Sequence, residues 1–125
     1  MFTNWTATLL LALPFLTSAT PALNPRVELG VANYYHPFLT FCGRVHTDDD
    51  LIVALSEAQF ARYPDACDLY IRVTGYNGNQ IVVQIADKCP GSECGVGDID
   101  LTPAGFLMLF DSLSVGRGRV SWDWA

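Results

Sequence analysis

Three aspartates and two cysteines lie close together in the segment ADKCPGSECGVGDIDLTPAGF, residues 86–106. The carboxylates of Asp87, Asp98 and Asp100 could accept hydrogen bonds from a polar ligand or exchange a proton with a reacting group. The same side chains could instead accept backbone N–H groups and hold a turn together. The residue types therefore predict either a binding or acid–base site, or a structural loop, at this place in the chain.

The segments on either side of this loop are expected to hold it firmly. The loop follows IVVQI, residues 81–85, whose β-branched residues are typical of a buried strand. It leads into a predicted helix over residues 103–113, with Thr102 as the N-cap and Pro103 at the first helical position. The inner side of that helix is predicted to carry Phe106, Leu107, Leu109, Phe110 and Leu113.

The first 22 residues carry no charged side chain, and residues 7–16 form an apolar run that is too short to cross a bilayer. Small residues follow, so cleavage after Ala19 or Ala22 is plausible. We therefore interpret residues 1–22 as a signal peptide and residues 23–125 as the mature domain. This predicts a secreted, extracellular protein with no membrane segment after cleavage.

Charge and cysteine content argue against nucleic acid and zinc as partners. The formal net charge is −6, and no cluster of basic residues could displace counterions from a nucleic acid. The 4 cysteines are expected to form two disulfides, with three possible pairings. No CxxC spacing is present, and both histidines lie outside the segment between Cys89 and Cys94, which argues against zinc. We expect no metal and no organic cofactor.

The rest of the chain predicts short strands joined by turns. Tyr34 and Tyr35 adjoin in the first strand and must point to opposite faces, so one of them is exposed or lines a groove. The aspartates of residues 48–50 are expected to form a solvated turn, and Asp98 to be exposed. The last strand places Trp122 and Trp124 on one face, one in the core and one at its rim.

The predicted strands cover residues 30–37, 51–56, 68–76, 80–87 and the C-terminal GRGRVSWDWA, with a short helix begun by Ser56 and a hairpin turn at residues 77–79. The fold class is therefore mostly β, a small closed or nearly closed barrel with one or two short helices.

Several motifs, in order, resemble a known family. They are GVANYYHP, FCG, LIVALSEAQF, ACDLYIRV, NGNQIVVQIADKCPGSEC, DIDLTPAGF and a terminal VSW, and they run from about Gly30 to Trp122. Together they resemble the double-psi β-barrel family, which includes rare lipoprotein A, barwin, the first domain of expansins and the fungal single-domain expansin-like loosenins. The most specific parts are ADKCPG and DIDLTPAGF.

The resemblance implies a six-stranded barrel with a shallow groove that holds an extended polysaccharide. The essential aspartate of expansins corresponds to Asp100, the aspartate that opens the turn to Asp87, and the polar residue of the first strand to Asn33. Tyr34 or Tyr35 would supply the aromatic surface of the groove. By analogy with barwin, the resemblance also implies the disulfides Cys42–Cys67 and Cys89–Cys94.

Two catalytic patterns known from lytic relatives are incomplete. Where related endoglucanases place their catalytic base, this chain has His36, and where rare lipoprotein A would place a histidine, it has Ser56 and Glu57. We therefore assign no catalytic residue and expect an expansin-like monomer that loosens cell-wall polysaccharide without hydrolysis. The glycan could be cellulose, chitin or a peptidoglycan-like polymer. A secreted protease inhibitor or effector of the barwin type is the alternative, and a lytic enzyme is the third possibility.

Overall fold

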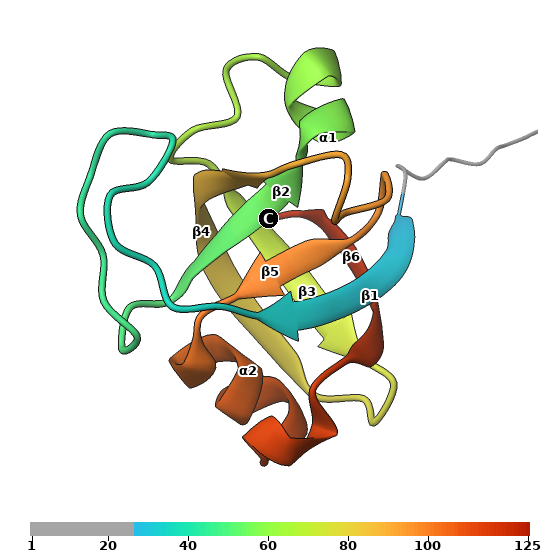
Figure 1. The fold of residues 1–125 in the computed structure, drawn as a ribbon. Helices are drawn as coiled ribbons and strands as arrows, with labels where there is room; N and C mark the ends of the chain where they lie inside the picture. Colours follow the sequence, from blue (N-terminus) through green and yellow to red (C-terminus); the bar gives the residue numbers. More distant parts are fainter. Residues whose placement is uncertain (1–26) are drawn as a thin grey trace, which may run out of the picture.

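Alternating apolar residues close six strands into a barrel, as the computed structural model of residues 27–125 shows (Figure 1). The order around the barrel is β1, β5, β2, β4, β3, β6. Two pairs, β1 with β5 and β2 with β4, run parallel, and the remaining pairs run antiparallel. The elements are β1 Glu28–Tyr34, β2 Ile52–Ser56, α1 Glu57–Arg62, β3 Tyr70–Gly75, β4 Gln80–Cys89, β5 Ile99–Leu101, α2 Pro103–Phe110, η1 Leu113–Val115 and β6 Gly118–Trp124. The predicted mostly-β barrel is confirmed.

The β3–β4 hairpin forms as predicted around the turn at residues 77–79, with Thr74 paired to Gln80. Its strand β4 departs from the prediction in one respect. Ile81, Val83 and Ile85 point into the barrel, but Val82 lies on the outer face and is 47% exposed. The strand is therefore buried on one face, because an antiparallel hairpin of a small barrel has solvent on its other side.

Both helices begin at the predicted caps. The Ser56 hydroxyl accepts the Gln59 N–H, and the Thr102 hydroxyl accepts the Gly105 N–H. The second helix is shorter than the predicted range to residue 113, since α2 ends at Phe110 and Asp111 adopts a left-handed conformation with φ 68°. Leu107 is 42% exposed, so its predicted place on the inner side is wrong.

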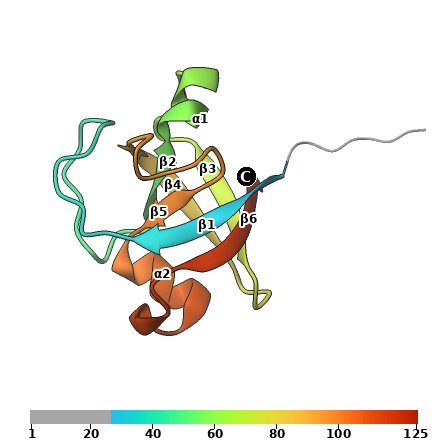
Figure 2. The same ribbon diagram turned by 45° about the vertical axis from the view of Figure 1, so that its right-hand side comes forward.

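The barrel interior is filled from all strands and closed at one end by α2. Figures 1 and 2 show α2 across one end of the barrel and α1 at the other. Trp122 is buried in the core, and Trp124 is partly buried beside it, with ring centroids 5.8 Å apart. The two tryptophans therefore occupy the core and its rim, as predicted. The largest fully buried side chains include Trp122, Phe106, Leu55, Ile71, Ile85 and Ile99.

Two disulfides tie loops to the barrel. They join Cys42 to Cys67 and Cys89 to Cys94, which is the pairing that the resemblance implies. Within residues 27–125, no helix is long and apolar enough to cross a membrane. The predicted signal peptide, residues 1–22, lies outside the described residues and stays a prediction.

Candidate functional site

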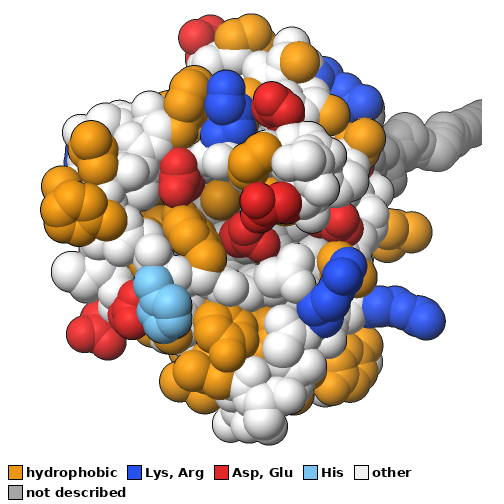
Figure 3. All heavy atoms as spheres, in the orientation of Figure 1, with side chains coloured by type: hydrophobic (Ala, Val, Ile, Leu, Met, Phe, Trp, Pro, Cys, Tyr) orange, Lys and Arg blue, Asp and Glu red, His pale blue; other side chains and the backbone are white. Residues whose placement is uncertain are grey.

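Strand register places four residues in a row across the outside of the barrel. Asn33 of β1 pairs with Asp100 of β5, which pairs with Ala54 of β2. Ala54 in turn pairs with Asp87 of β4. Residues in register share a face, so these four, here called the acidic row, cross four strands. In Figure 3, which has the orientation of Figure 1, carboxylate side chains gather at the centre of this face, surrounded by hydrophobic ones.

Asp87 accepts three hydrogen bonds within the protein. One carboxylate oxygen accepts the backbone N–H groups of Phe41, at 2.8 Å, and Lys88, at 3.0 Å. The other accepts the hydroxyl of Tyr35 at 2.8 Å. Asp87 therefore braces the loop after β1 against β4, and it has little capacity left for a ligand.

Tyr35 lies over the acidic row, but Tyr34 does not. The ring of Tyr35 packs with the Cys89–Cys94 disulfide on the side chain of Ala54, which is 2% exposed. Burial, the hydrogen bond to Asp87 and the charges of Asp87 and Asp100 all raise the pKa of the Tyr35 hydroxyl, so it stays protonated. Tyr34 packs instead against the Phe106 ring at the α2 end of the barrel, with centroids 5.0 Å apart.

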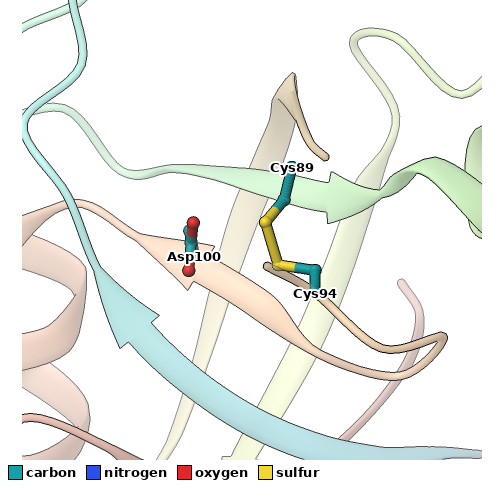
Figure 4. Close-up of side chains that lie close together, drawn as sticks. All are labelled: Cys89, Cys94 and Asp100. Atoms are coloured by element: carbon teal, nitrogen blue, oxygen red, sulfur yellow. A yellow bond between two sulfur atoms is a disulfide. The ribbon is translucent and has the colours of Figure 1, made fainter. Parts of the chain in front are cut away.

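Asp100 is the member of the row that keeps acceptor capacity. Its carboxylate is half-buried, and no main-chain amide of residues 27–125 donates to it. Burial raises its pKa, a hydrogen bond with Asn33 opposes that shift, and the charges of Glu93, Asp98 and Asp87 raise it further. Figure 4 shows the Asp100 carboxylate standing on β5 beside the Cys89–Cys94 disulfide. Its oxygens thus lie at a partly dry surface and keep acceptor capacity.

The cluster of Asp100 with Cys89 and Cys94 does not make a metal site. Their potential ligand atoms lie within 4.8 Å of one another. The two sulfurs, however, are bonded to each other, and a cysteine binds a metal as a thiolate.

Two acidic residues near the row differ from the sequence interpretation. Asp98 was expected to be exposed, but it is half-buried and structural, because its carboxylate accepts the N–H groups of Val31 and Gly95. Glu93 was not singled out, yet among charged groups it contributes most to the raised pKa of Asp100. Its position inside the segment closed by Cys89 and Cys94 was the available signal.

The 48–50 turn is more organised than a solvated run of aspartates. The carboxylate of Asp50 accepts the Thr47 N–H and contacts the His46 ring at 2.9 Å, and these bonds lower its pKa. His36 is exposed and bonds Asp48 at 2.8 Å. Neither histidine lies in the acidic row.

A projecting apolar loop, residues 38–45, also escaped the sequence interpretation. A bridge between Leu39 and Val45 and the disulfide from Cys42 hold it in shape. Its exposed fractions are high: Phe38 73%, Leu39 67%, Phe41 54% and Val45 58%. Lys88 covers the Phe41 ring at 4.1 Å from its centroid. The apolar sequence FLTFCGRV was the signal for it.

The chain is similar to three proteins of known sequence or structure. A ripening-related protein of Oryza sativa subsp. japonica is 33% identical over 84 residues, which are 65% of this chain and 50% of that protein. An expansin of Clavibacter michiganensis is 28% identical, with a TM-score of 0.68, and a mutant of it in complex with cellohexaose is 25% identical with the same score. A papain inhibitor of Streptomyces is 27% identical, with a TM-score of 0.67.

The extent of these similarities differs among the relatives. The chain spans half the length of the ripening-related protein and of the expansin. The match to the papain inhibitor covers 80% of this chain and 94% of that one. No model of a protein family matches the sequence.

Proposed function

We propose, because the chain belongs to the double-psi β-barrel family, that it is a secreted expansin-like protein. It would bind an extended cell-wall polysaccharide along the acidic row. It would loosen the packing of that polysaccharide without cleaving it. The observation that carries this proposal is Asp100, a half-buried carboxylate with free acceptor capacity beside Asn33. The crystallised complex of the related expansin mutant with cellohexaose supports a β-linked glucan as the class of ligand.

The physical basis of binding is hydrogen bonding at a partly desolvated surface. Sugar hydroxyls would donate to the Asp100 carboxylate, and the Asn33 amide would both donate and accept. Charge-assisted hydrogen bonds of this kind are roughly twice as strong as neutral ones. The protonated Tyr35 hydroxyl and ring would form the adjoining surface.

The proposal of binding without cleavage is supported by the state of the second carboxylate of the acidic row, Asp87. Inverting glycosidases use one carboxylic acid as general acid and one carboxylate as general base. In the acidic row, Asp87 is held by three hydrogen bonds and is not available to activate a water. Holding one glycan chain by hydrogen bonds would instead weaken its contacts with neighbouring chains.

Isothermal titration calorimetry with cellohexaose tests this proposal. We expect Asp100→Ala to weaken binding by about tenfold or more, because it removes a hydrogen bond to a charged group worth ~1.5–3 kcal/mol. Asp100→Asn, which keeps one acceptor oxygen, should lose less. Asp49→Ala is the matched control, at an exposed carboxylate without a hydrogen-bond partner in the described part of the chain. Equal affinities for the wild type and Asp100→Ala would remove the acidic row as the binding surface.

The assignment as a non-hydrolytic protein needs a separate measurement. The protein should weaken strips of cellulose paper under load while releasing no soluble reducing sugar from cellulose, chitin or peptidoglycan. Release of sugar that disappears in Asp100→Asn would instead make the protein a lytic enzyme, and its loss in Glu93→Gln as well would identify Glu93 as the second carboxylate.

Inhibition of a papain-type protease is the second candidate, supported by the match over 94% of the Streptomyces inhibitor. The apolar loop would be the inhibitory element, because a rigid projecting loop loses little conformational entropy on entering a protease cleft. In a papain assay, Phe38→Ser and Leu39→Ser should abolish inhibition and leave cellohexaose binding unchanged. No inhibition by the wild type would exclude this candidate.

A further inference from the structure

The barrel has a second hollowed face, on β1, β6 and β3, away from the acidic row. A hollow of about 560 Å³ adjoins another of about 360 Å³, and Tyr76 and Arg119 line both. Leu29, Thr74 and Ser121 contribute to the first hollow, and Arg117 to the second. We call this surface the Tyr76 hollow. Figure 2 brings β1, β6 and the β3–β4 hairpin that border it towards the viewer.

The Tyr76 ring is fixed as an open platform. It stacks on the Phe110 ring at 5.3 Å between centroids and an interplanar angle of 23°, yet Tyr76 remains 65% exposed. Phe110 reaches this position because Gly118 and Gly75 have no side chain, and a Cβ on Gly118 would overlap its ring. The Tyr76 N–H also bonds the Arg119 carbonyl at 3.1 Å. One face of the Tyr76 ring is therefore packed against Phe110, and the opposite face is open to solvent.

Two guanidinium groups flank this platform without neutralisation. Arg117 and Arg119 make no ion pair and no side-chain hydrogen bond with another residue of the described range 27–125. By contrast, Arg44 lies 3.5 Å from Asp68, and Arg62 lies 3.6 Å from Glu28. Figure 3 shows basic side chains at its right-hand edge, beside β1 and β6. In a protein of net charge −6, this is a local reversal of sign.

We propose that the Tyr76 hollow binds an acidic polysaccharide, one whose sugar rings carry carboxylate groups. A sugar ring would stack on the open face of Tyr76, and its carboxylate would accept the parallel N–H groups of Arg117 or Arg119. The Thr74 and Ser121 hydroxyls, on neighbouring strands, would bond sugar hydroxyls. Two arginines are too few to neutralise a nucleic acid backbone. Asp98, whose carboxylate accepts the N–H of Val31 at the border of the first hollow, is a nearby acidic group that opposes binding of an anion.

This site is independent of the proposed function. The acidic row lies on β1, β5, β2 and β4, whereas the Tyr76 hollow lies on β1, β6 and β3. One molecule could therefore hold a neutral glycan and an acidic glycan at the same time and connect two components of a wall.

Affinity electrophoresis in gels containing polygalacturonate tests the proposal. At about 50 mM salt we expect the wild type to be retarded, and the retardation to fall steeply towards about 200 mM. Arg117→Gln combined with Arg119→Gln should weaken binding about tenfold or more, since each removes a charge-assisted hydrogen bond. The matched control is Arg72→Gln, an exposed arginine on β3 that lines neither hollow and should change affinity less than about twofold.

Further variants separate stacking from charge. Tyr76→Phe keeps the ring and should bind as the wild type does, whereas Tyr76→Ala should bind several-fold more weakly. Asp100→Ala should leave polygalacturonate binding unchanged, so failure of the acidic row and failure of this site are distinguishable. No retardation of the wild type, or equal loss in Arg72→Gln, would overturn the proposal. Equally tight binding of poly-glutamate, unaffected by Tyr76→Ala, would point to an acidic protein as the partner and would overturn it too.

Discussion

At the scale of single residues, Asp87 and Asp100 show how environment assigns different roles to the same side chain. They lie two strands apart on one face of the barrel. Asp87 accepts three hydrogen bonds from its own chain, from Tyr35, Phe41 and Lys88, and is therefore structural. Asp100 has Asn33 beside it, and burial makes its charged form costly. A carboxylate that is left under-bonded at a partly dry surface is available to a ligand.

The raised pKa of Asp100 predicts how stability depends on pH. Between the ordinary value of 3.8 and the higher folded value, the folded chain binds more protons than the unfolded chain. The free energy of unfolding therefore falls as pH rises through that window. Asp100→Asn lacks this proton, so urea unfolding should show the variant gaining stability relative to the wild type between acid and neutral pH.

The control for this prediction is Asp49→Asn, which removes an equal charge from an exposed position. A constant difference in unfolding free energy between Asp100→Asn and the wild type across the same pH range would contradict the prediction. It would mean that burial does not raise the pKa of Asp100.

At the scale of elements, a close crossing of main chains holds β1 against the loop that leads to β5. A Cβ on Gly97 would overlap the Leu29 carbonyl oxygen, and a Cβ on Gly30 would overlap the Gly97 carbonyl. The indole N–H of Trp122 also donates to the Gly97 carbonyl at 3.0 Å. This crossing fixes where β5, and with it Asp100, lies beside β1.

We expect Gly97→Ala to destabilise the protein by about 2–4 kcal/mol, because backbone atoms must move to admit the methyl group. Gly105→Ala is the matched control within α2. There the new Cβ would meet its neighbours at 3.6 Å or more, so the better helix propensity of alanine should stabilise by up to ~1 kcal/mol. Thermal or urea unfolding of both variants checks the pair. If Gly97→Ala leaves the free energy of unfolding unchanged, the close crossing of the two main chains is contradicted.

At the scale of the whole molecule, the disulfides compensate for a small core. Cys42–Cys67 closes a separation of 25 residues and ties the apolar loop to the segment before β3, whereas Cys89–Cys94 closes a separation of 5. Chain entropy predicts a loss of about 3.5 kcal/mol for the first and about 2 kcal/mol for the second. Removing each pair as a double alanine variant and comparing the denaturation midpoints tests this order. A larger loss for the short loop would contradict it.

Local patterns in the sequence determined most elements of this protein and much of its class, but not β5, Ile99–Leu101, which lies in a segment predicted to be a loop. The capping residues Ser56 and Thr102, the turn at residues 77–79 and the alternation along β6 depend on near neighbours, and the structure agrees with each of them. The motif resemblance added the number of six strands in the barrel and the pairing of the cysteines. Near-neighbour preferences are strong enough to read without knowing the fold.

Only the tertiary structure decided which of these residues share a surface and which remain free to bind. Asp87 meets Tyr35 across 52 positions, and Asp98 meets Val31 across 67. The Tyr76 hollow likewise needs β1, β3 and β6 to lie side by side. Such contacts depend on strand register and on which side chains find a hydrogen-bond partner after the barrel closes. A one-residue slip would turn every side chain of a strand to the other face.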